Sequence, residues 1–382
     1  MPGRETRSGR YITQLEGYRA FIPKPLPPDP PITYDDGLLE LLSRADRALG
    51  RLDGATEALP DADLFVFMYV RREAALSSQI EGTQASLIDL LVFEAQATQP
   101  GTPLDVEEIA NYVGAMNLGL TRLAELPVSL RMIREIHERL LRGVRGSDRT
   151  PGEFRRSQKW IGPPGCPLGE ATYVPPPVDE MTVALGAWER FLHHEGPMPA
   201  LIKVGVAHAQ FETIHPFLDG NGRVGRLLIT FLLVERGILS RPLLYLSHYL
   251  NQHRSQYYDS LQSVRDDGDW EGWIGFFLKG VYEVAQEATT TARRIVSMRE
   301  EHRTLVIQNL GRGAARALVL LDRLYTRPIV SVNNVRQMTE LGFARANTLV
   351  AELVEMGLLS ETTGRSRNRL FSYAPYLALF ED

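Results

Sequence analysis

Residues 215–226, HPFLDGNGRVGR, bring together side-chain types that phosphate chemistry uses. His215 precedes a proline, and because a residue before proline avoids the α region, the helical pattern upstream is predicted to end there. Gly220, Asn221 and Gly222 are residue types that tolerate a positive φ angle at little cost. Successive backbone amides in such a turn can converge on an anion. The stretch therefore predicts an anion-binding turn with a histidine at its edge.

An apolar segment, RVGRLLITFLLVERG, follows the turn and predicts a helix that ends at Gly237. Its N-terminus faces the turn, where unpaired N–H groups and the helix dipole favour an anion. Arg223 and Arg226 are three residues apart, so they share a helix face, and each can fork onto phosphate oxygens. Asp219 supplies one hard oxygen ligand, and Mg²⁺ is typically held by one or two carboxylates plus substrate phosphates. Together these residues predict a site for a polyphosphate and Mg²⁺.

The plainer alternative is a glycine turn that only caps a helix and leaves two arginines on the surface. That alternative does not account for a histidine, an aspartate and two spaced arginines within so short a stretch. The Walker A pattern GxxxxGK[ST] is absent, so the turn is not a P-loop.

The stretch matches the signature HPFx[D/E]GNGRxxR at every fixed position, and the chain thereby resembles the Fic family. The resemblance implies a mainly α-helical fold with one β-hairpin flap, and AMPylation, the transfer of AMP from ATP to a protein hydroxyl. His215 would be the general base, a role that suits a neutral histidine with an ordinary pKa of about 6.5. Asp219 would hold Mg²⁺. The turn amides and Asn221 would cradle phosphates and the arginines would balance their charge. The implied ATP-binding residues are Gly220, Asn221, Gly222, Arg223, Val224, Gly225, Arg226 and Tyr258.

A second match to the family lies upstream, in the sequence SSQIEG. Ser77 and Glu81 fit the inhibitory pattern [S/T]xxxE[G/N], and their spacing of four places them on one helix face. The resemblance implies that Glu81 pairs with the second arginine of the loop, Arg226. A carboxylate there would deny the guanidinium to the γ-phosphate of ATP. The alternative is an ordinary solvated glutamate before a helix-ending glycine.

Two adjacent tyrosines follow the motif helix, in the sequence YLNQHRSQYYDSL. The family places a tyrosine there that can stack on adenine, and Tyr258 is the candidate. Tyr257 is equally well explained as a core aromatic residue. Arg265 stands where some relatives carry an asparagine that contacts the base, so the base preference stays open.

Several elements must position these residues. From about residue 34 to 119, apolar residues recur at helical spacing. Further helices are predicted at 105–123, 129–142, 178–194, 199–213, 223–236, 254–266 and 270–309. The segment QKWIGPPGCPLGEATYVPPP is too rich in Gly and Pro for a helix and predicts a hairpin, which resembles the family's flap. An extended edge of this flap, at residues 159–176, could dock a target protein by main-chain pairing.

The two ends of the chain differ from the middle. Residues 1–32 end in IPKPLPPDPPI and are predicted to form an extended, proline-rich arm. Near the C-terminus, the sequence from 333 to 373 predicts a helix-turn-helix followed by a two-stranded wing. The expected division is therefore an arm at 1–32, an N-terminal helical region with the inhibitory helix at 33–119, a catalytic core at 120–305 and a winged helix at 306–382.

DNA is an open question for the expected winged helix. Arg365, Arg367 and Arg369 alternate and would share one strand face, which suits phosphate contact. The expected recognition helix carries Glu352 and Glu355, and winged helices also bind proteins. The sequence therefore favours neither DNA binding nor protein binding for the winged helix.

Composition narrows the remaining possibilities. The net charge of −5 and pI near 6.0 argue against a global basic field that would attract nucleic acid. The single cysteine, Cys166, allows neither an intrachain disulfide nor a cysteine zinc cluster. The N-terminus has no signal-peptide pattern, and the longest apolar run is shorter than the ~20 residues of a membrane span, so a cytoplasmic protein is expected. The resemblance also implies a homodimer, since relatives often dimerise.

The sequence thus favours an enzyme that transfers AMP from ATP to a Ser, Thr or Tyr hydroxyl of a target protein and of itself. Pyrophosphate would leave, and Glu81 would inhibit the reaction. One alternative keeps the fold and changes the chemistry to phosphoryl or another phosphodiester transfer. A second alternative is a DNA-binding regulator whose loop senses ATP.

Overall fold

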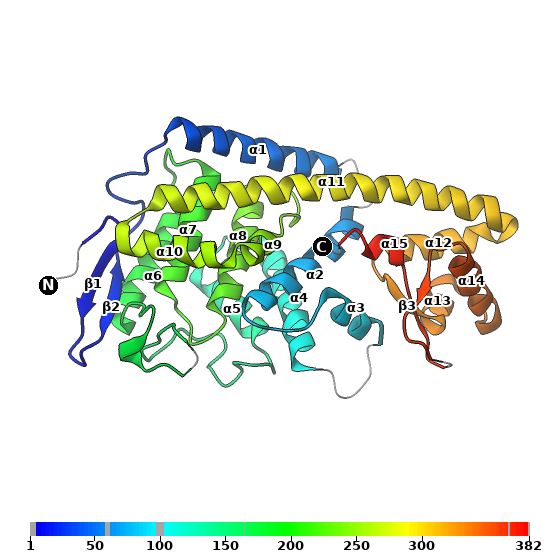
Figure 1. Ribbon diagram of the computed structural model, residues 1–382, viewed down its shortest axis with the longest axis horizontal. Coiled ribbons are helices and arrows are strands. Elements are labelled where there is room, and N and C mark those ends of the chain that lie inside the picture. Colours follow the sequence, from blue (N-terminus) through cyan, green and yellow to red (C-terminus); the bar gives the residue numbers. More distant parts are fainter. Residues whose placement is uncertain (1–4, 58–61, 97–102, 164, 366, 381–382) are drawn as a thin grey trace.

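The computed structural model describes residues 5–57, 62–96, 103–163, 165–365 and 367–380. The chain is mainly helical, as the sequence predicts (Figure 1). The N-terminal half contains β1 (Gly9–Thr13), β2 (Arg19–Pro23), α1 (Asp36–Glu57), α2 (Ala62–Ile80), α3 (Leu87–Gln96), α4 (Leu104–Leu123), α5 (Leu130–Leu140) and α6 (Val178–His193). The remainder contains α7 (Ala200–Ile214), α8 (Asn221–Glu235), α9 (Ser247–Gln252), α10 (Arg254–Asp267), α11 (Trp270–Leu310), α12 (Ala314–Leu324), β3 (Ile329–Ser331), α13 (Val332–Thr339), α14 (Phe343–Glu355), β4 (Ser360–Glu361), β5 (Leu370–Ser372) and α15 (Ala374–Leu377).

Helices α7 and α8 form the centre of the molecule. Every residue from Leu201 to Ile214 is buried, and a helix that is buried all round must be covered on every side. Helices α6, α8, α10 and α11 contact α7, and α8 in turn contacts α2, α4 and α5. Helix α1 lies along α11 on the outside of this core (Figure 1). The loop between α7 and α8, residues 215–220, is thereby held at both of its ends by buried helices.

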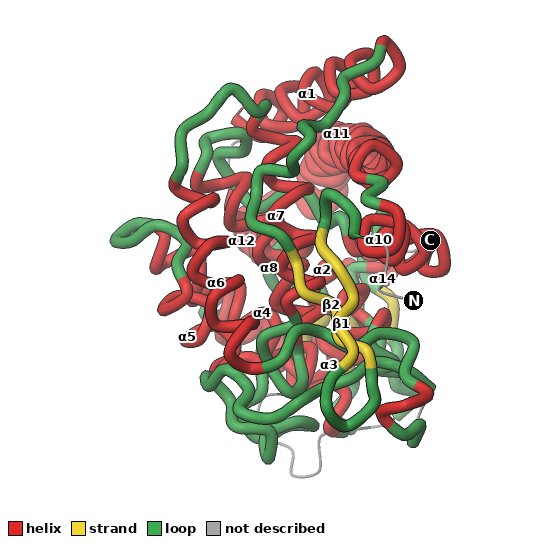
Figure 2. The backbone as a smooth tube through the Cα atoms, turned by 90° about the vertical axis from the view of Figure 1, so that its left-hand side faces the viewer, coloured by secondary structure: helices red, strands yellow, loops and turns green. Residues whose placement is uncertain are grey.

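The first part of the expected extended arm is a β-hairpin. Strands β1 and β2 pair antiparallel, with Tyr11 opposite Phe21 (Figure 2). Gly17, in the turn, has a φ of 88°, a conformation that L side chains rarely adopt. The buried ring of Phe21 anchors the hairpin to the core. Pairing between β1 and β2 and the burial of Ala20 and Phe21, rather than the prolines that follow, therefore decide the structure of residues 9–23.

The segment predicted to be a hairpin flap, residues 159–176, forms one antiparallel bridge, between Ile161 and Tyr173. A short 3₁₀ turn, Leu168–Glu170, lies between the two sides. The backbone N–H of Phe21 donates to the carbonyl of Val174 at 2.9 Å, so β2 runs beside the second side of the flap. The N-terminal hairpin and the flap are thus one continuous surface feature.

The C-terminal part combines helices α12, α13 and α14 with a three-stranded antiparallel sheet in the order β3-β5-β4. The predicted apolar stripe of α14, residues Ala346, Leu349, Val350 and Leu353, is buried. Helix α11 runs without a break from the core into this part, so the expected boundary at residue 305 falls inside a helix (Figure 1). Among the described residues, no helix has the length and apolar character needed to cross a membrane.

Candidate active site

Helix α7 ends at the histidine, as the proline after it predicts. His215 has a φ of 50° and a ψ of 62°, and its backbone N–H still donates to the Phe211 carbonyl at 2.9 Å. A left-handed conformation in a residue with a side chain is strained, and such strain gathers at functional sites. The Nδ1 atom of the half-buried imidazole has no hydrogen-bond partner within the described part of the chain. Because protein atoms cover Nδ1, a ligand could reach the ring only through Nε2.

The electrostatic surroundings of His215 favour the neutral imidazole. Burial lowers the pKa of His215, and the positive charges of Arg155, Arg265 and Lys159 lower it further, to about 3. The sequence suggested an ordinary pKa near neutrality; the structure corrects this, because the ring is buried and three positive charges add to the effect. His215 is therefore uncharged across the physiological pH range, and a pKa this low makes the imidazole a weak proton acceptor while no anion offsets the cations.

The turn after His215 has the expected backbone but a different use for Asn221. Gly220 has a φ of 76° and caps α8, and the first helical bond runs from the Val224 N–H to the Gly220 carbonyl. The amides of residues 221–223 are therefore first-turn groups without helical partners, which favour an anion. The Asn221 side chain is already engaged, because its Oδ1 accepts from the Phe217 N–H and its Nδ2 donates to the Phe217 carbonyl, both at 2.8 Å. Asn221 holds the turn in shape instead of contacting phosphate with its side chain.

Val224 and Gly225, implied as ATP contacts, face the protein core. Val224 is fully buried in the apolar core. The Gly225 carbonyl accepts from Nδ1 of His208 at 2.9 Å, and a Cβ at Gly225 would lie 2.2 Å from Oε1 of Glu212. These two residues lie on the α8 face that packs against α7, so they support the helix and not the nucleotide.

The first arginine of the loop lies against an acidic residue that the sequence motifs did not identify. Arg223 is almost fully buried, and its Nε and Nη1 have no hydrogen-bond partner among the described residues. Its nearest carboxylates are Glu108 at 3.6 Å and Asp219 at 3.8 Å. Glu108, buried on α4, also accepts from the Thr83 hydroxyl at 2.9 Å. The sequence did offer one signal for Glu108: it lies four residues before Tyr112, on the apolar side of the predicted helix. A charged residue on a buried helix side indicates a buried ionic partner, because an unpaired charge is seldom buried.

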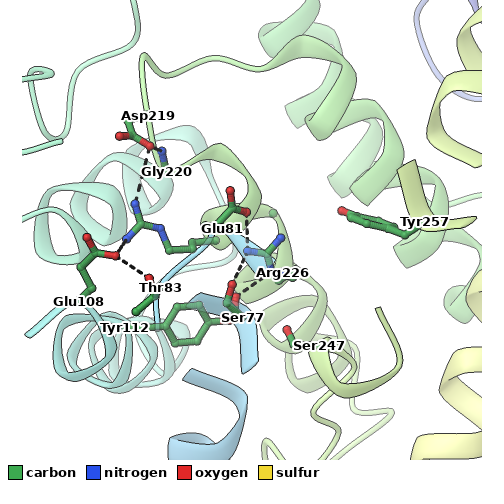
Figure 3. Close-up of polar contacts among 12 residues, drawn as sticks. Ser77, Glu81, Thr83, Glu108, Tyr112, Asp219, Gly220, Arg226, Ser247 and Tyr257 are labelled. Carbon is green, nitrogen blue, oxygen red and sulfur yellow. Dashed lines mark hydrogen bonds and ion pairs between the residues drawn. The ribbon is translucent and has the colours of Figure 1, made fainter. Parts of the chain in front are cut away.

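The second arginine meets both residues of the SSQIEG motif (Figure 3). Nε of Arg226 donates to the Ser77 hydroxyl at 2.7 Å and Nη2 donates to the Ser77 carbonyl at 2.9 Å. Nη2 also donates to Oε1 of Glu81 at 2.7 Å. Burial alone would raise the pKa of Glu81, but the Arg226 charge and hydrogen bond outweigh it and lower that pKa. Gly222 permits this contact, because a Cβ there would lie 2.3 Å from the same carboxylate oxygen.

Two further buried carboxylates lie near Arg226, and neither was singled out from the sequence. Glu73 accepts from the Tyr112 hydroxyl at 3.1 Å and from the backbone N–H of Ser247 at 3.2 Å. Burial raises the pKa of Glu73 despite these bonds. Burial also raises the pKa of Glu212, to about 7. Burial thus favours the neutral form of both carboxyl groups, and Glu81 is the carboxylate that stabilises the buried charge of Arg226.

The two adjacent tyrosines have different surroundings. Tyr257 is buried and donates its hydroxyl to Nε2 of His208 at 3.0 Å, so it belongs to the core. Tyr258 is 43% exposed, and the guanidinium of Arg254 lies 6.0 Å from its ring centroid. Arg265 lies seven residues further along α10, about two turns away on the same side of the helix, and is buried with its guanidinium over the ring of Tyr173. Tyr258 is the aromatic surface that a base could reach.

Asp219, the expected metal ligand, lies directly before the glycine turn. Its side chain is partly exposed, and its Oδ1 accepts from the Gly220 N–H at 2.6 Å. His137 accepts from the Gly152 N–H through Nδ1, so its Nε2 must donate to the Asp219 carbonyl, at 3.0 Å. The His137 ring also stacks on Phe217, with centroids 3.7 Å apart. Within the described ranges no group of three or more His, Cys, Asp or Glu could hold a metal alone, so a cation here would need phosphate or water ligands.

Comparison with known proteins places these features in a wider context. Residues 39–121 match the model of the Fic/DOC family N-terminal region, and residues 127–233 match the model of the Fic/DOC family. The first match contains Ser77 and Glu81, and the second contains the whole loop from His215 to Arg226.

Several relatives carry the name protein adenylyltransferase Fic, and two of them show the extent of the similarity. The one from Culex quinquefasciatus is 33% identical over 151 residues, which is 39% of this chain and 27% of the relative. The one from Aedes aegypti is 30% identical over 249 residues, 63% of this chain and 46% of the relative. The chain thus matches less than half of the length of either relative. A crystal structure of a Fic family protein from Desulfovibrio desulfuricans G20 shares the fold, with a TM-score of 0.58 at 19% identity, over 90% of this chain and 97% of that one.

Proposed function

Because this chain belongs to the Fic/DOC family, we propose that it transfers AMP from ATP to a Ser, Thr or Tyr hydroxyl of a protein, itself included. The observation that carries the proposal is the position of His215 beside the first turn of α8. That turn presents amides without helical partners, and behind it lies the buried Arg223 guanidinium with unpaired N–H groups. A neutral base next to a polyphosphate site is what adenylyl transfer requires.

In the proposed reaction, His215 acts as the general base. Its Nε2 nitrogen accepts the proton of the hydroxyl as the oxygen attacks the α-phosphorus. The new O–P bond forms as the bond between the α-phosphorus and the bridging oxygen breaks, and pyrophosphate leaves. The proton passes from the imidazole to solvent. Bound ATP is negative and offsets the cations around His215, which strengthens the base when substrate is present.

Asp219 would hold Mg²⁺ in this site, and the residues present fit that role. A single partly exposed carboxylate suits a cation that takes its other ligands from phosphate and water. Mg²⁺ would neutralise charge on the phosphates. The hydrogen bond from His137 and the stacking on Phe217 fix the backbone from which this carboxylate projects.

Glu81 would inhibit the enzyme from within the same chain. Its carboxylate occupies Nη2 of Arg226, which is the group that the γ-phosphate would use. While Glu81 is bound to Arg226, the γ-phosphate would meet the negative Glu81 carboxylate and not a free Arg226 guanidinium. ATP would then bind in a pose that is wrong for in-line attack. Release of Glu81 is the step that activates the site.

The remaining substrate contacts come from opposite sides of the site. Tyr258 offers an exposed ring for adenine. The flap offers an edge for the target protein, because β2 covers the side at Val174 while Trp160 and Ile161 on the other side are exposed. Main-chain pairing along that open edge would bring a target hydroxyl towards His215.

The C-terminal module, residues 314–380, fits a winged helix, with α14 in the place of a recognition helix and the β4–β5 hairpin as the wing. Arg365, Arg367 and Arg369 are all exposed on that hairpin, which favours contact with nucleic acid phosphates. DNA binding is therefore a second candidate function, for this module alone. Fluorescence anisotropy of labelled duplex DNA at low salt tests it, and equal anisotropy for the chain and an R365A/R367A/R369A variant would count against it.

Intact-protein mass spectrometry tests the principal proposal. The Glu81→Gly variant, incubated with ATP and Mg²⁺, should gain mass in units of AMP. A matched double variant that also carries His215→Ala should gain none, while it still binds ATP. A gain in units of phosphate would replace AMP transfer with phosphoryl transfer, and an equal AMP gain in the double variant would remove His215 as the base.

A further inference from the structure

Arg265 joins three segments of the chain beneath the flap. It is only 7% exposed, and its guanidinium carbon lies 3.9 Å from the ring centroid of Tyr173, on the flap. Its Nε donates to the hydroxyl of Thr213, in the last turn of α7, at 3.3 Å. Its Nη1 donates to Oε1 of Gln262, on α10, at 3.0 Å. The Arg265 side chain therefore contacts the flap, the end of α7 just before His215, and its own helix, α10.

The two partners of Arg265 are themselves tied to the site. Thr213 precedes His215 by two residues, and its carbonyl accepts from the Tyr173 hydroxyl. Tyr173 forms the bridge of the flap, exchanging backbone hydrogen bonds with Ile161 at 2.8 and 3.0 Å. The flap edge and the end of α7 are thus held together at one point, and Arg265 packs against that point.

Gln262 extends this connection to the N-terminal hairpin. Its Nε2 donates to the Tyr11 hydroxyl at 3.0 Å, and the same hydroxyl donates to Asp266 at 2.8 Å. The end of α10 therefore holds β1 as well as the flap. Since β2 runs beside the flap at Val174, the hairpin, the flap and the end of α7 all rest on this part of α10.

Arg155 anchors the flap from its other end. Its Nε donates to the His215 carbonyl at 3.0 Å, its Nη1 donates to the Ser157 carbonyl at 3.3 Å, and its Nη2 donates to the Pro176 carbonyl. Ser157 and Pro176 lie at the two ends of the flap. Arg155 thus ties the base of the flap to His215, while Arg265 ties the middle of the flap to the turn of α7 before His215.

We propose that Arg265 is a positioning residue for the transfer reaction, which holds the target-docking flap in a fixed relation to the His215 imidazole. This inference rests on the proposed function and adds a role for a residue whose hydrogen bonds and ring contact are with other parts of the chain: Tyr173, Thr213 and Gln262. The stacked, planar guanidinium is suited to it, because it can pack on Tyr173 and hydrogen-bond to Thr213 at the same time. An ammonium could keep the charge but not both contacts.

The charge of Arg265 acts on the same imidazole. The groups that face His215 are Arg155, Arg265 and Lys159, together with the backbone carbonyl of Glu212. Burial is the largest cause of the lowered pKa of His215, the three cations add to it, and the carbonyl opposes it. Loss of the Arg265 charge should therefore raise the pKa of His215, whereas loss of its shape alone should not.

Two substitutions separate shape from charge. Arg265→Lys keeps the charge and loses the stacking, and Arg265→Gln loses both. Each is made in the Glu81→Gly background, with exposed Arg294→Gln on α11 as the matched control. Three readouts are needed: hydrogen exchange of the Ile161 and Tyr173 amides, NMR titration of the His215 ring without nucleotide, and the rate of AMP incorporation.

Both Arg265 variants should show at least about tenfold faster exchange at the two flap amides, which is the effect of about 1.4 kcal/mol. Both should incorporate AMP more slowly, with ATP affinity unchanged. Only Arg265→Gln should raise the pKa of His215. Flap exchange equal to that of the control in both variants overturns the proposal, as does unchanged AMP incorporation beside a loosened flap.

The two proposals fail in different ways. If no variant incorporates AMP, not even Glu81→Gly alone, the proposed function fails, and the exchange and titration readouts still decide whether Arg265 positions the flap and the histidine. If Arg265→Gln does not fold, Tyr173→Phe replaces it: this change keeps the ring under Arg265 and removes the hydrogen bond to the Thr213 carbonyl. Unaltered exchange at Ile161 in that variant and in Arg265→Lys overturns the proposal.

Discussion

Replacing Glu81 by glutamine tests the inhibitory contact with the smallest change of shape. The wild-type carboxylate accepts from Nη2 of Arg226 at 2.7 Å, with the arginine 2% and the glutamate 31% exposed at their side chains. Glu81→Gln removes the negative charge and keeps the side-chain length. The two bonds from Arg226 to Ser77 remain, so the guanidinium stays where the γ-phosphate needs it. The variant should therefore transfer AMP faster than the wild type.

The size of the effect follows from the burial of the pair. Hydrogen bonds to charged groups contribute about 1.5–3 kcal/mol, and Arg226 stays charged in the variant. Exchange of the carboxylate for a neutral amide moves the contact from the upper to the lower end of that range, a loss of about 1–1.5 kcal/mol. The lower part of that range applies to the direct contact, because Glu81 is about one-third exposed and partly screened by water. Relief of repulsion between Glu81 and the γ-phosphate adds to it. A total of about 2 kcal/mol corresponds to an increase of about 30-fold at sub-saturating ATP.

The assay is the initial rate of AMP incorporation from α-labelled ATP, with ATP well below half-saturation. Glu300→Gln serves as the matched control, because Glu300 forms a surface ion pair with Arg299 at 3.7 Å and is 66% exposed. That control should match the wild type. A Glu81→Gln rate within twofold of the wild type would refute the reasoning, since Arg226 would then be accessible to ATP whether or not Glu81 carries a charge.

Three further predictions concern the supports of the loop. Asn221→Ala should lower the free energy of unfolding by about 1–3 kcal/mol in urea titration, because it leaves the backbone N–H and carbonyl of buried Phe217 unpaired; unchanged stability would show that the turn does not depend on this side chain. Gly225→Ala should cost about 1–3 kcal/mol by the same measurement, because the methyl group would overlap Oε1 of buried Glu212; a shift below 0.5 kcal/mol, roughly the scale of a surface change, would contradict the packing of α7 on α8. Burial lowers the pKa of His208 to about 4, so its contribution to stability is present above pH 6.5 and is lost as pH falls towards 4. His208→Asn should reduce the acid-induced loss of stability by about 1.4 kcal/mol per pH unit between pH 6 and 5, and parallel stability–pH curves for variant and wild type would exclude this role.

Much of the local structure could be predicted from the sequence. The end of α7 at His215, the glycine turn and the start of α8 all depend on residues within one short stretch, where proline and glycine restrict or widen the backbone. The helical spacing of apolar residues placed α14 with its buried stripe. In contrast, residues 9–23 were predicted to be extended and form a hairpin, because pairing between β1 and β2 and the burial of Phe21 outweigh the effect of the prolines downstream.

Some residues of the candidate site could be predicted from the sequence and others could not. The motifs identified the side chains that meet at Arg226, because Ser77 and Glu81 lie one helical turn apart and follow a recognisable pattern. No comparable pattern marked Glu108 or Glu73. Their importance arises from α4 and α2 packing against α8, which brings buried carboxylates to the two arginines.

The sequence by itself determined the chemistry of the loop, because a base, a carboxylate, a turn and two guanidinium groups lie next to one another in the chain and their spacing sets their local geometry. Only the tertiary structure decided which of these groups face the core, since that depends on how α8 is rotated against α7. It also decided the place of Arg265, which lies under the flap and not beside the aromatic ring at Tyr258. Contacts between distant segments are set by the packing of whole helices. The residues next to a side chain in the sequence therefore do not predict which distant residue it will contact.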